Sequence, residues 1–85
     1  MYATVVQEFR PYRFICDEAG RYAVIEVRCG HVYCLDCDHP RHEAEDTPEG
    51  MAKVVGAHGW GDYDGALKLF RLMVDSEERY GQILW

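Results

Sequence analysis

The fold is decided by the stretch Tyr22-Ala23-Val24-Ile25-Glu26-Val27-Arg28-Cys29. Small or branched apolar residues and cysteine occupy every second position, and Tyr, Val, Glu and Arg stand between them. A period of two residues is typical of a β-strand, because successive side chains point to opposite faces. The turn-forming residues before it, with Gly20 among them, predict a hairpin that pairs this strand with Tyr12–Cys16. The segment Tyr2–Phe9 is rich in β-formers and is expected to supply a third strand.

The second half of the chain predicts two helices. Thr47-Pro48-Glu49 combines an N-cap residue, a proline suited to the first helical position and an acid near the positive end of the helix dipole. The helix that begins there is expected to end near Gly56. A longer helix is predicted over roughly Tyr63 to Tyr80, with Gly81 just beyond its end. Gly30 to Asp46 shows no periodicity and is predicted to be a loop that carries ligands.

Length and charge limit the classes of protein that this chain can represent. Its 85 residues suffice for a single domain over 1–85, and 15 acidic against 9 basic residues give a net charge of −6. Without clustered positive charge, neither nucleic acid nor an anionic membrane surface is an expected partner. No segment approaches the ~20 apolar residues of a spanning helix, so we expect a cytoplasmic protein. A domain this small often needs a metal, a disulfide or a partner to stabilise its core.

The sharpest chemical signal is Cys29-Gly30-His31-Val32-Tyr33-Cys34-Leu35-Asp36-Cys37, followed closely by His39 and His42. The two-residue spacing of Cys34 and Cys37 lets a tight turn aim both thiolates at one ion, and Zn²⁺ prefers four nitrogen or sulfur ligands in a tetrahedron. We predict zinc as the cofactor. The expected ligands are Cys29, Cys34 and Cys37 with His31 as the fourth, and His39 or His42 as alternatives for that fourth position.

Cys16 is the remaining cysteine, and the predicted hairpin separates it from this cluster. If the turn centres near Ala19, Cys16 lies opposite Tyr22, and Cys29 is seven residues further along the strand, about 23 Å away. No single ion spans that distance. Unless the hairpin is bent, Cys16 is expected to be a core residue on the face shared by Tyr12 and Phe14.

Two other chemistries use the same residues. A CxxC thiol redox protein usually holds its first thiol at a helix N-terminus, whereas here a hairpin precedes the pair and Asp36 and Asp38 disfavour a thiolate. A catalytic zinc would need an open position beside a base such as Glu43 or Glu45, and three thiolates are more typical of a structural ion. Since no nucleophile–base pair stands out, we expect an accessory subunit rather than a catalyst.

The second predicted helix has more apolar surface than a small sheet can bury. Its polar residues form one narrow stripe, and the rest of its circumference is largely apolar. It is therefore expected either to be deeply buried or to meet another chain, a larger subunit or a second copy. The apolar tail Ile83-Leu84-Trp85 is expected to dock on the domain or on that partner. The residues predicted to face the partner are Leu69, Phe70, Leu72, Met73 and Trp85.

The cysteine cluster resembles two known families. The spacing Cys29, His31, Cys34, Cys37 resembles the middle four ligands of a RING finger, but the opening and closing cysteine pairs of that family are absent, so ubiquitin-ligase activity is not implied. Gly20 through Cys34, followed by Asp46-Thr47-Pro48-Glu49 and Met51, resembles the small zinc-binding γ subunit of acetone carboxylase-type enzymes.

In the γ subunits a strand leads into a cysteine-glycine-histidine-x-aromatic-cysteine segment, which Arg28–Cys34 matches, and a threonine-proline-glutamate helix start follows. The family's later cysteine pair has no counterpart beyond Cys37. The resemblance implies a non-catalytic, zinc-bearing structural subunit of a multi-subunit ATP-dependent carboxylase, held against larger chains. A free-standing zinc-finger-like interaction adaptor is the alternative. In either case the fold class is a small α+β domain with a β-hairpin or three-stranded antiparallel sheet, a Cys/His metal loop and two helices.

Overall fold

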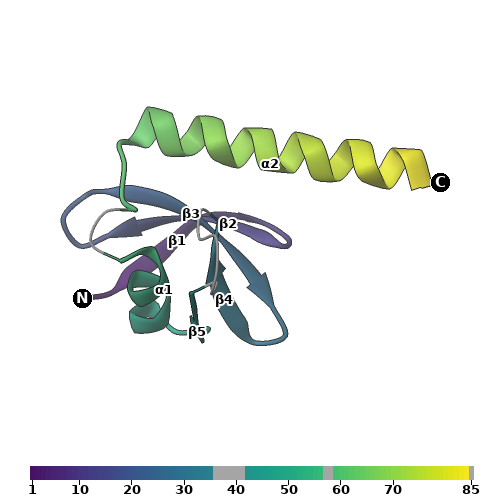
Figure 1. Ribbon diagram of the computed structural model, residues 1–85. Helices are drawn as coiled ribbons and strands as arrows, with labels where there is room; N and C mark the ends of the chain where they lie inside the picture. The colour runs from purple at the N-terminus through teal and green to yellow at the C-terminus, as the bar shows by residue number, and fades with distance from the viewer. Residues whose placement is uncertain (36–41, 57–58, 85) are drawn as a thin grey trace.

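The chain folds into one antiparallel sheet with a helix on each face. The computed structural model describes residues 1–35, 42–56 and 59–84, with 78–84 described as backbone (Figure 1). The strands pair in the order β1-β2-β3-β4-β5, so each strand lies beside its neighbours in sequence. The elements are β1 (Ala3–Phe9), β2 (Tyr12–Asp17), β3 (Tyr22–Arg28), β4 (His31–Cys34), β5 (Glu43–Glu45), α1 (Pro48–Val55) and α2 (Tyr63–Leu84).

The α+β class, the antiparallel sheet and the two helices confirm the prediction, but the sheet has five strands rather than two or three. The region from Gly30 to Asp46, predicted to be a loop, contains β4 and β5. Both strands are short, of four and three residues, and β4 offers only Val32 and Cys34 as alternate buried positions. So short an alternation is not visible as a period in the sequence. Residues 31–34 form a strand because they pair with β3, and residues 43–45 form a strand because they pair with β4.

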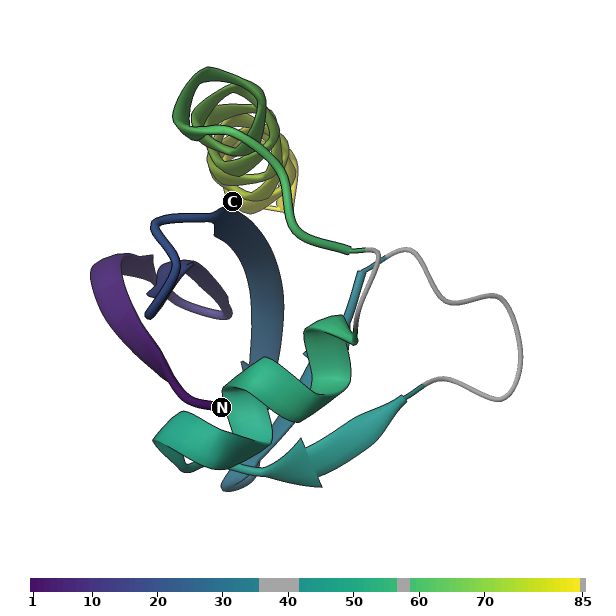
Figure 2. The ribbon, with the colours of Figure 1, turned by 90° about the vertical axis from the view of Figure 1, so that its left-hand side faces the viewer.

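The central hairpin has the predicted register. Cys16 lies opposite Tyr22, and Phe14 lies opposite Val24. The alternation along β3 divides its side chains as expected: Ala23 and Ile25 enter the core beneath α1, and Val24 enters the core beneath α2. The two helices therefore cover opposite faces of the sheet (Figure 2).

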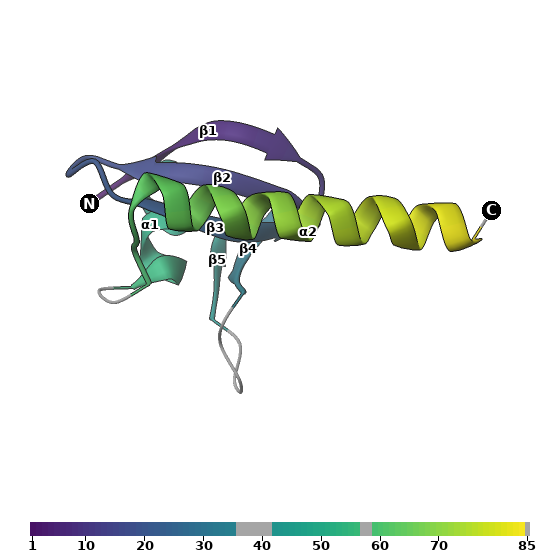
Figure 3. The same ribbon diagram turned by 90° about the horizontal axis from the view of Figure 1, so that it is seen from above.

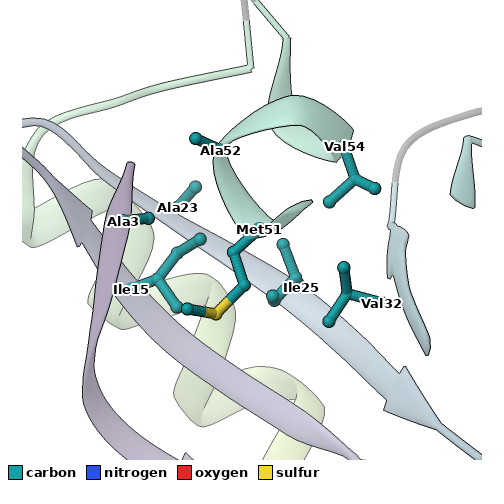
Figure 4. Packing of buried hydrophobic residues seen from close by; sticks show 8 residues of the cluster. All are labelled: Ala3, Ile15, Ala23, Ile25, Val32, Met51, Ala52 and Val54. Carbon is teal, nitrogen blue, oxygen red and sulfur yellow. The ribbon is translucent and has the colours of Figure 1, made fainter. Parts of the chain in front are cut away.

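The helix α1 begins and ends where the sequence predicts. The hydroxyl of Thr47 accepts a hydrogen bond from the Gly50 amide at 2.9 Å, and Gly56 ends the helix with φ 73°. Its inner face packs on the curved face of the sheet, where the Met51 side chain points in among strand residues (Figure 4). The buried residues of this cluster are Ala3, Ile15, Ala23, Ile25, Val32, Met51, Ala52 and Val54.

The helix α2 packs over β2 and β3 on the other face, around the ring of Phe14. Ring centroids of Tyr22, Tyr63 and Phe70 lie 5.4, 5.6 and 5.9 Å from that of Phe14. Aromatic pairs at such separations add to the apolar area that the contact buries. The first half of α2 is therefore firmly held by its own sheet.

The second half of α2 extends beyond the sheet (Figures 1 and 3). The helix has 22 residues, about 33 Å at 1.5 Å per residue. Among its side chains that the structure describes, which end at Glu77, those packed against the Phe14 cluster reach to Val74. The predicted end at Gly81 is wrong, because the helix continues through Gly81 to Leu84. A glycine inside a helix costs only ~1 kcal/mol, so it does not by itself end one. Trp85 lies outside the described residues.

Candidate functional site

The cysteine that opens the predicted metal motif forms a turn. Cys29 and Gly30 are the two residues between β3 and β4, where Arg28 pairs with His31. Their φ angles are 52° and 77°, and a two-residue hairpin turn of this kind needs positive φ at both positions. Cys29 is exposed at the tip. The Cys-Gly pair thus has a conformational role that explains its presence without a metal.

The next two predicted ligands lie on opposite faces of β4. The Nε2 atom of His31 is 3.8 Å from Oε1 of Glu43 on the neighbouring strand, on one face. Val32 and Cys34 are buried on the face that α1 covers. Because side chains alternate along a strand, His31 and Cys34 point away from each other, and three residue steps along the strand also separate them by about 10 Å.

The predicted ligand set is therefore not assembled by the described part of the chain. Cys29 is at the tip of the hairpin, and His31 and Cys34 face opposite sides of the sheet. Cys37 and His39 lie outside the described residues. Within residues 1–35, 42–56 and 59–84, no three Cys, His, Asp or Glu side chains are placed to hold a metal ion. Cys29 and His31 do not fit a zinc site that includes Cys34.

The other end of β4 brings Cys34 and His42 together. The amide of Cys34 donates a hydrogen bond to the carbonyl of His42 at 3.3 Å, and both residues line a cavity of about 190 Å³ beside Val54 and Val55. Cys34 is bonded in a disulfide. Cys34 and His42 therefore lie side by side where the chain leaves β4 and returns to β5.

Cys16 is separate from both ends of β4. It is half-buried opposite Tyr22, its thiol donates to the carbonyl of Asp17 at 3.3 Å, and it is free, as is Cys29. The neighbouring Cys16 thiol, together with burial, raises the pKa of Tyr22. Cys16 therefore contributes to the packing beside Phe14, on the face that the sequence predicted.

The charged clusters hold the fold together. Arg13 on β2 bonds to Glu8 on β1 and, at 2.5 Å, to Asp46 just before α1. The hydrogen bond that Arg13 donates to Asp46 is the main cause that raises the pKa of Arg13. In the β2–β3 turn, burial alone would raise the pKa of Asp17, but hydrogen bonds from Arg21 and from the Ala19 amide outweigh it and lower that pKa. These groups tie strands and turns together.

Of the five residues predicted to face a partner, the four that the structure describes divide into three groups. Phe70 is 3% exposed and belongs to the core of its own chain, which corrects its assignment to a partner surface. Leu69 and Met73 are half-buried at the margin of the same core. Leu72 points outward and is 62% exposed. Trp85, the fifth, lies outside the described residues.

The sequence analysis missed a groove between α2 and the end of β1. The helix lies over β2 and β3, so β1 runs beside it with Phe9 39% exposed (Figure 3). The groove has a volume of about 360 Å³; we call it the α2–β1 groove, and its walls include Gln7, Phe9, Leu67, Phe70, Arg71 and Val74.

A β-bulge in β1 creates this groove. The register of β1 against β2 shifts between Val5 and Gln7. Before the shift, Val5 is opposite Ile15 on the α1 face; after it, Gln7 and Phe9 are opposite residues of the α2 face. One extra residue reverses the faces of all that follow. Strict alternation would have placed Phe9 with Val5, and no local signal in the sequence marks the bulge.

The chain matches no protein-family model, no curated protein and no solved structure. Across the part of the chain that the structure describes, no helix is long and apolar enough to cross a membrane. The candidate functions accordingly rest on the geometry of this chain.

Proposed function

We propose that this protein is a non-catalytic interaction module that binds another protein chain through the α2–β1 groove and the projecting half of α2. The observation that carries the proposal is the projection itself: α2 extends to Leu84, whereas the residues that pack it on the sheet end at Val74 (Figure 1). The ten residues beyond Val74 continue the helix past the described residues that pack on the Phe14 cluster.

Such a segment is expected to need a partner. Isolated helices shorter than ~12–15 residues are marginal in water, and most helix stability in proteins comes from packing of an apolar face. The sequence of the projecting part includes Tyr80, Ile83 and Leu84, which are poorly suited to remain in water. A second chain that covers these positions removes the free-energy cost of exposing their apolar side chains to water.

The groove supports the same conclusion. Phe9 is a large apolar residue that the chain leaves 39% exposed on the wall of the groove, and Leu67 and Val74 line the same groove. Contiguous exposed apolar surface on a small domain is typical of a protein-binding site. A larger enzyme subunit, as the carboxylase resemblance implies, is one such partner and stays a prediction.

A capture experiment with matched variants tests the proposal. Tagged full-length protein, expressed in its native host, is compared with Phe9→Ser and with Leu72→Ser, after circular dichroism has shown that both variants keep the fold. We expect a stoichiometric protein companion, either a second copy or a different chain, that Phe9→Ser loses and Leu72→Ser retains. Absence of any stoichiometric companion, or equal retention by both variants, contradicts the proposal.

A second candidate is thiol–disulfide chemistry at Cys34, and the disulfide bond of Cys34 favours it. Zinc binding there, with Cys34 and His42 at the base of the β4–β5 segment, needs the reduced state of the same cysteine. Counting thiols in the denatured, unreduced protein separates the two. Two reactive thiols, Cys16 and Cys29, are expected for the disulfide, whereas four thiols and one zinc per chain support the metal site.

A further inference from the structure

We infer that the open edge of β1 pairs, in antiparallel orientation, with β1 of a second copy of this chain. The surface is the row of main-chain groups along that edge, so the inference goes beyond the proposed function, which rests on the α2–β1 groove and on α2. The strand β1 is the first in the order β1-β2-β3-β4-β5 and pairs with β2. In the described part of the chain, no helix or strand lies along its other side (Figure 3).

Exposed apolar side chains gather at this edge. Of the seven large apolar residues that the described structure leaves exposed, five lie within residues 1–9. Val5 and Val6, in the middle of β1, are 44% and 51% exposed. Sheet proteins usually protect an edge strand with lysine or proline or by keeping the strand very short. The strand β1 has seven residues and contains neither Lys nor Pro, so its edge is open to pairing with another strand.

The pairing of β2 shows which main-chain groups of β1 face the open edge. The amide of Asp17, at the end of β2, donates a hydrogen bond to the carbonyl of Arg21, just before β3. Because bonded and non-bonded pairs alternate along antiparallel strands, the odd-numbered residues of β2 bond to β3 and the even-numbered ones bond to β1. The β1 residues opposite odd-numbered residues of β2, whose N–H and C=O groups therefore point to the open edge, are Ala3, Val5 and Glu8.

The β-bulge makes this edge selective for a strand of the same sequence. Along one edge of a regular strand, every second residue offers its main-chain groups, whereas β1 offers those of residues 3, 5 and 8. A regular strand therefore stays in step with β1 on only one side of the bulge. A second copy carries the same extra residue. When it runs antiparallel about a point between Val6 and Gln7, Val5 of each copy lies opposite Glu8 of the other.

The side chains of this pair lie on the same face, as pairing within one sheet requires. Val5 is opposite Ile15, which belongs to the core beneath α1. Glu8 bonds to Arg13, whose guanidinium lies 3.9 Å from the sulfur of Met51 in α1. Without the bulge, residues 5 and 8 would point to opposite faces, and this register would be excluded.

The contact is small and closes on itself. An interface made mainly by two seven-residue strands falls at the low end of specific interfaces, below ~1,200 Å². A two-fold contact uses the same edge on both copies, so it gives a dimer and not a fibre. The dimer is therefore expected to dissociate on dilution.

Val5→Pro tests the inference on the purified full-length protein. Sedimentation equilibrium should find a wild-type particle of twice 9.8 kDa at high protein concentration. Because the N–H group of Val5 faces the open edge, proline removes a hydrogen bond to the second copy and none to β2. Two hydrogen bonds are lost per dimer, so the dissociation constant should rise at least ~10-fold. Circular dichroism should show an unchanged fold.

A charge at position 5 tests the register and serves if Val5→Pro does not fold. Val5→Glu sets two like-charge pairs against Glu8 of the other copy, and Val5→Lys sets two opposite-charge pairs, so their dissociation constants should differ at least ~10-fold. The matched controls are Leu72→Glu and Leu72→Lys, at a position that is 62% exposed on α2. Both should stay within about twofold of the wild-type value.

Three outcomes overturn the inference. The first is a wild-type protein that stays monomeric at all concentrations, and the second is a dimer that a folded Val5→Pro variant leaves intact. The third is an equal dissociation constant for Val5→Glu and Val5→Lys, which would assign the dimer to another surface. In each case, capture of a different stoichiometric chain that depends on Phe9 would leave the proposed function intact.

Discussion

Replacing Phe70 and Leu72 in turn gives the clearest test of how α2 is held. The two positions are two residues apart on one helix, yet Phe70 is 3% exposed against the Phe14 ring and Leu72 is 62% exposed. Phe→Ala changes in a core cost ~3–5 kcal/mol, whereas exposed substitutions usually stay within ~0.5 kcal/mol. Phe70→Ala should therefore be severely destabilising, and Leu72→Ala should be nearly neutral.

The size of the effect matters because the domain is small. At 0.05–0.15 kcal/mol per residue, a chain of 85 residues has a free energy of unfolding of roughly 4–13 kcal/mol. Phe70→Ala removes about a quarter of this free energy or more. With a urea m-value near ~1.5 kcal/mol per molar, the unfolding midpoint should fall by ~2–3 M.

The assay is urea unfolding followed by far-ultraviolet circular dichroism, at one protein concentration for all variants because association would shift the midpoint. Phe70→Leu is the milder variant, expected to cost about 1.5 kcal/mol, and keeps the comparison measurable if Phe70→Ala does not fold. Equal losses from Phe70→Ala and Leu72→Ala, or a loss below ~1 kcal/mol from Phe70→Ala, would refute the docking of α2 described above.

Three further outcomes are expected. Gly50→Ala should lower the melting temperature, because the added Cβ would overlap the carbonyl oxygen of Glu45. At an exposed helical position the same change usually stabilises a protein by ~1 kcal/mol, so a rise in melting temperature would contradict this packing. Asp17→Asn should be less stable than wild type at pH 7, and the difference should shrink toward pH 2. Because the fold lowers the pKa of Asp17, its carboxylate stabilises the protein at pH values above the ordinary pKa near ~3.9, and this stability is lost as the pH falls through the lowered pKa. Urea unfolding midpoints of both proteins at pH 7 and pH 3 measure the difference. Cys29→Ser should leave metal content and melting unchanged, since Cys29 is an exposed turn residue; loss of zinc on this change, by elemental analysis, would restore Cys29 to the metal site.

The sequence could predict elements that carry their own local signals. The β2–β3 hairpin follows from the alternation of β3 and the glycine turn, and α1 follows from Thr47, Pro48 and Gly56. The first part of the metal motif has a second physical explanation. Cysteine and glycine before a histidine resemble ligand spacing, but at residues 29 and 30 they form a two-residue turn with positive φ.

The sequence by itself therefore determined the hairpin, the start of α1, the apolar face of α2 and the acidic charge, because each depends on residues close together in the chain. Only the tertiary structure decided the five-stranded order, the opposite faces of His31 and Cys34, and the groove beside Phe9. Those features depend on strand register, which a bulge after Val5 and a turn at Cys29 set. A shift of one residue exchanges the two faces of a strand, and pairing between distant residues selects the register.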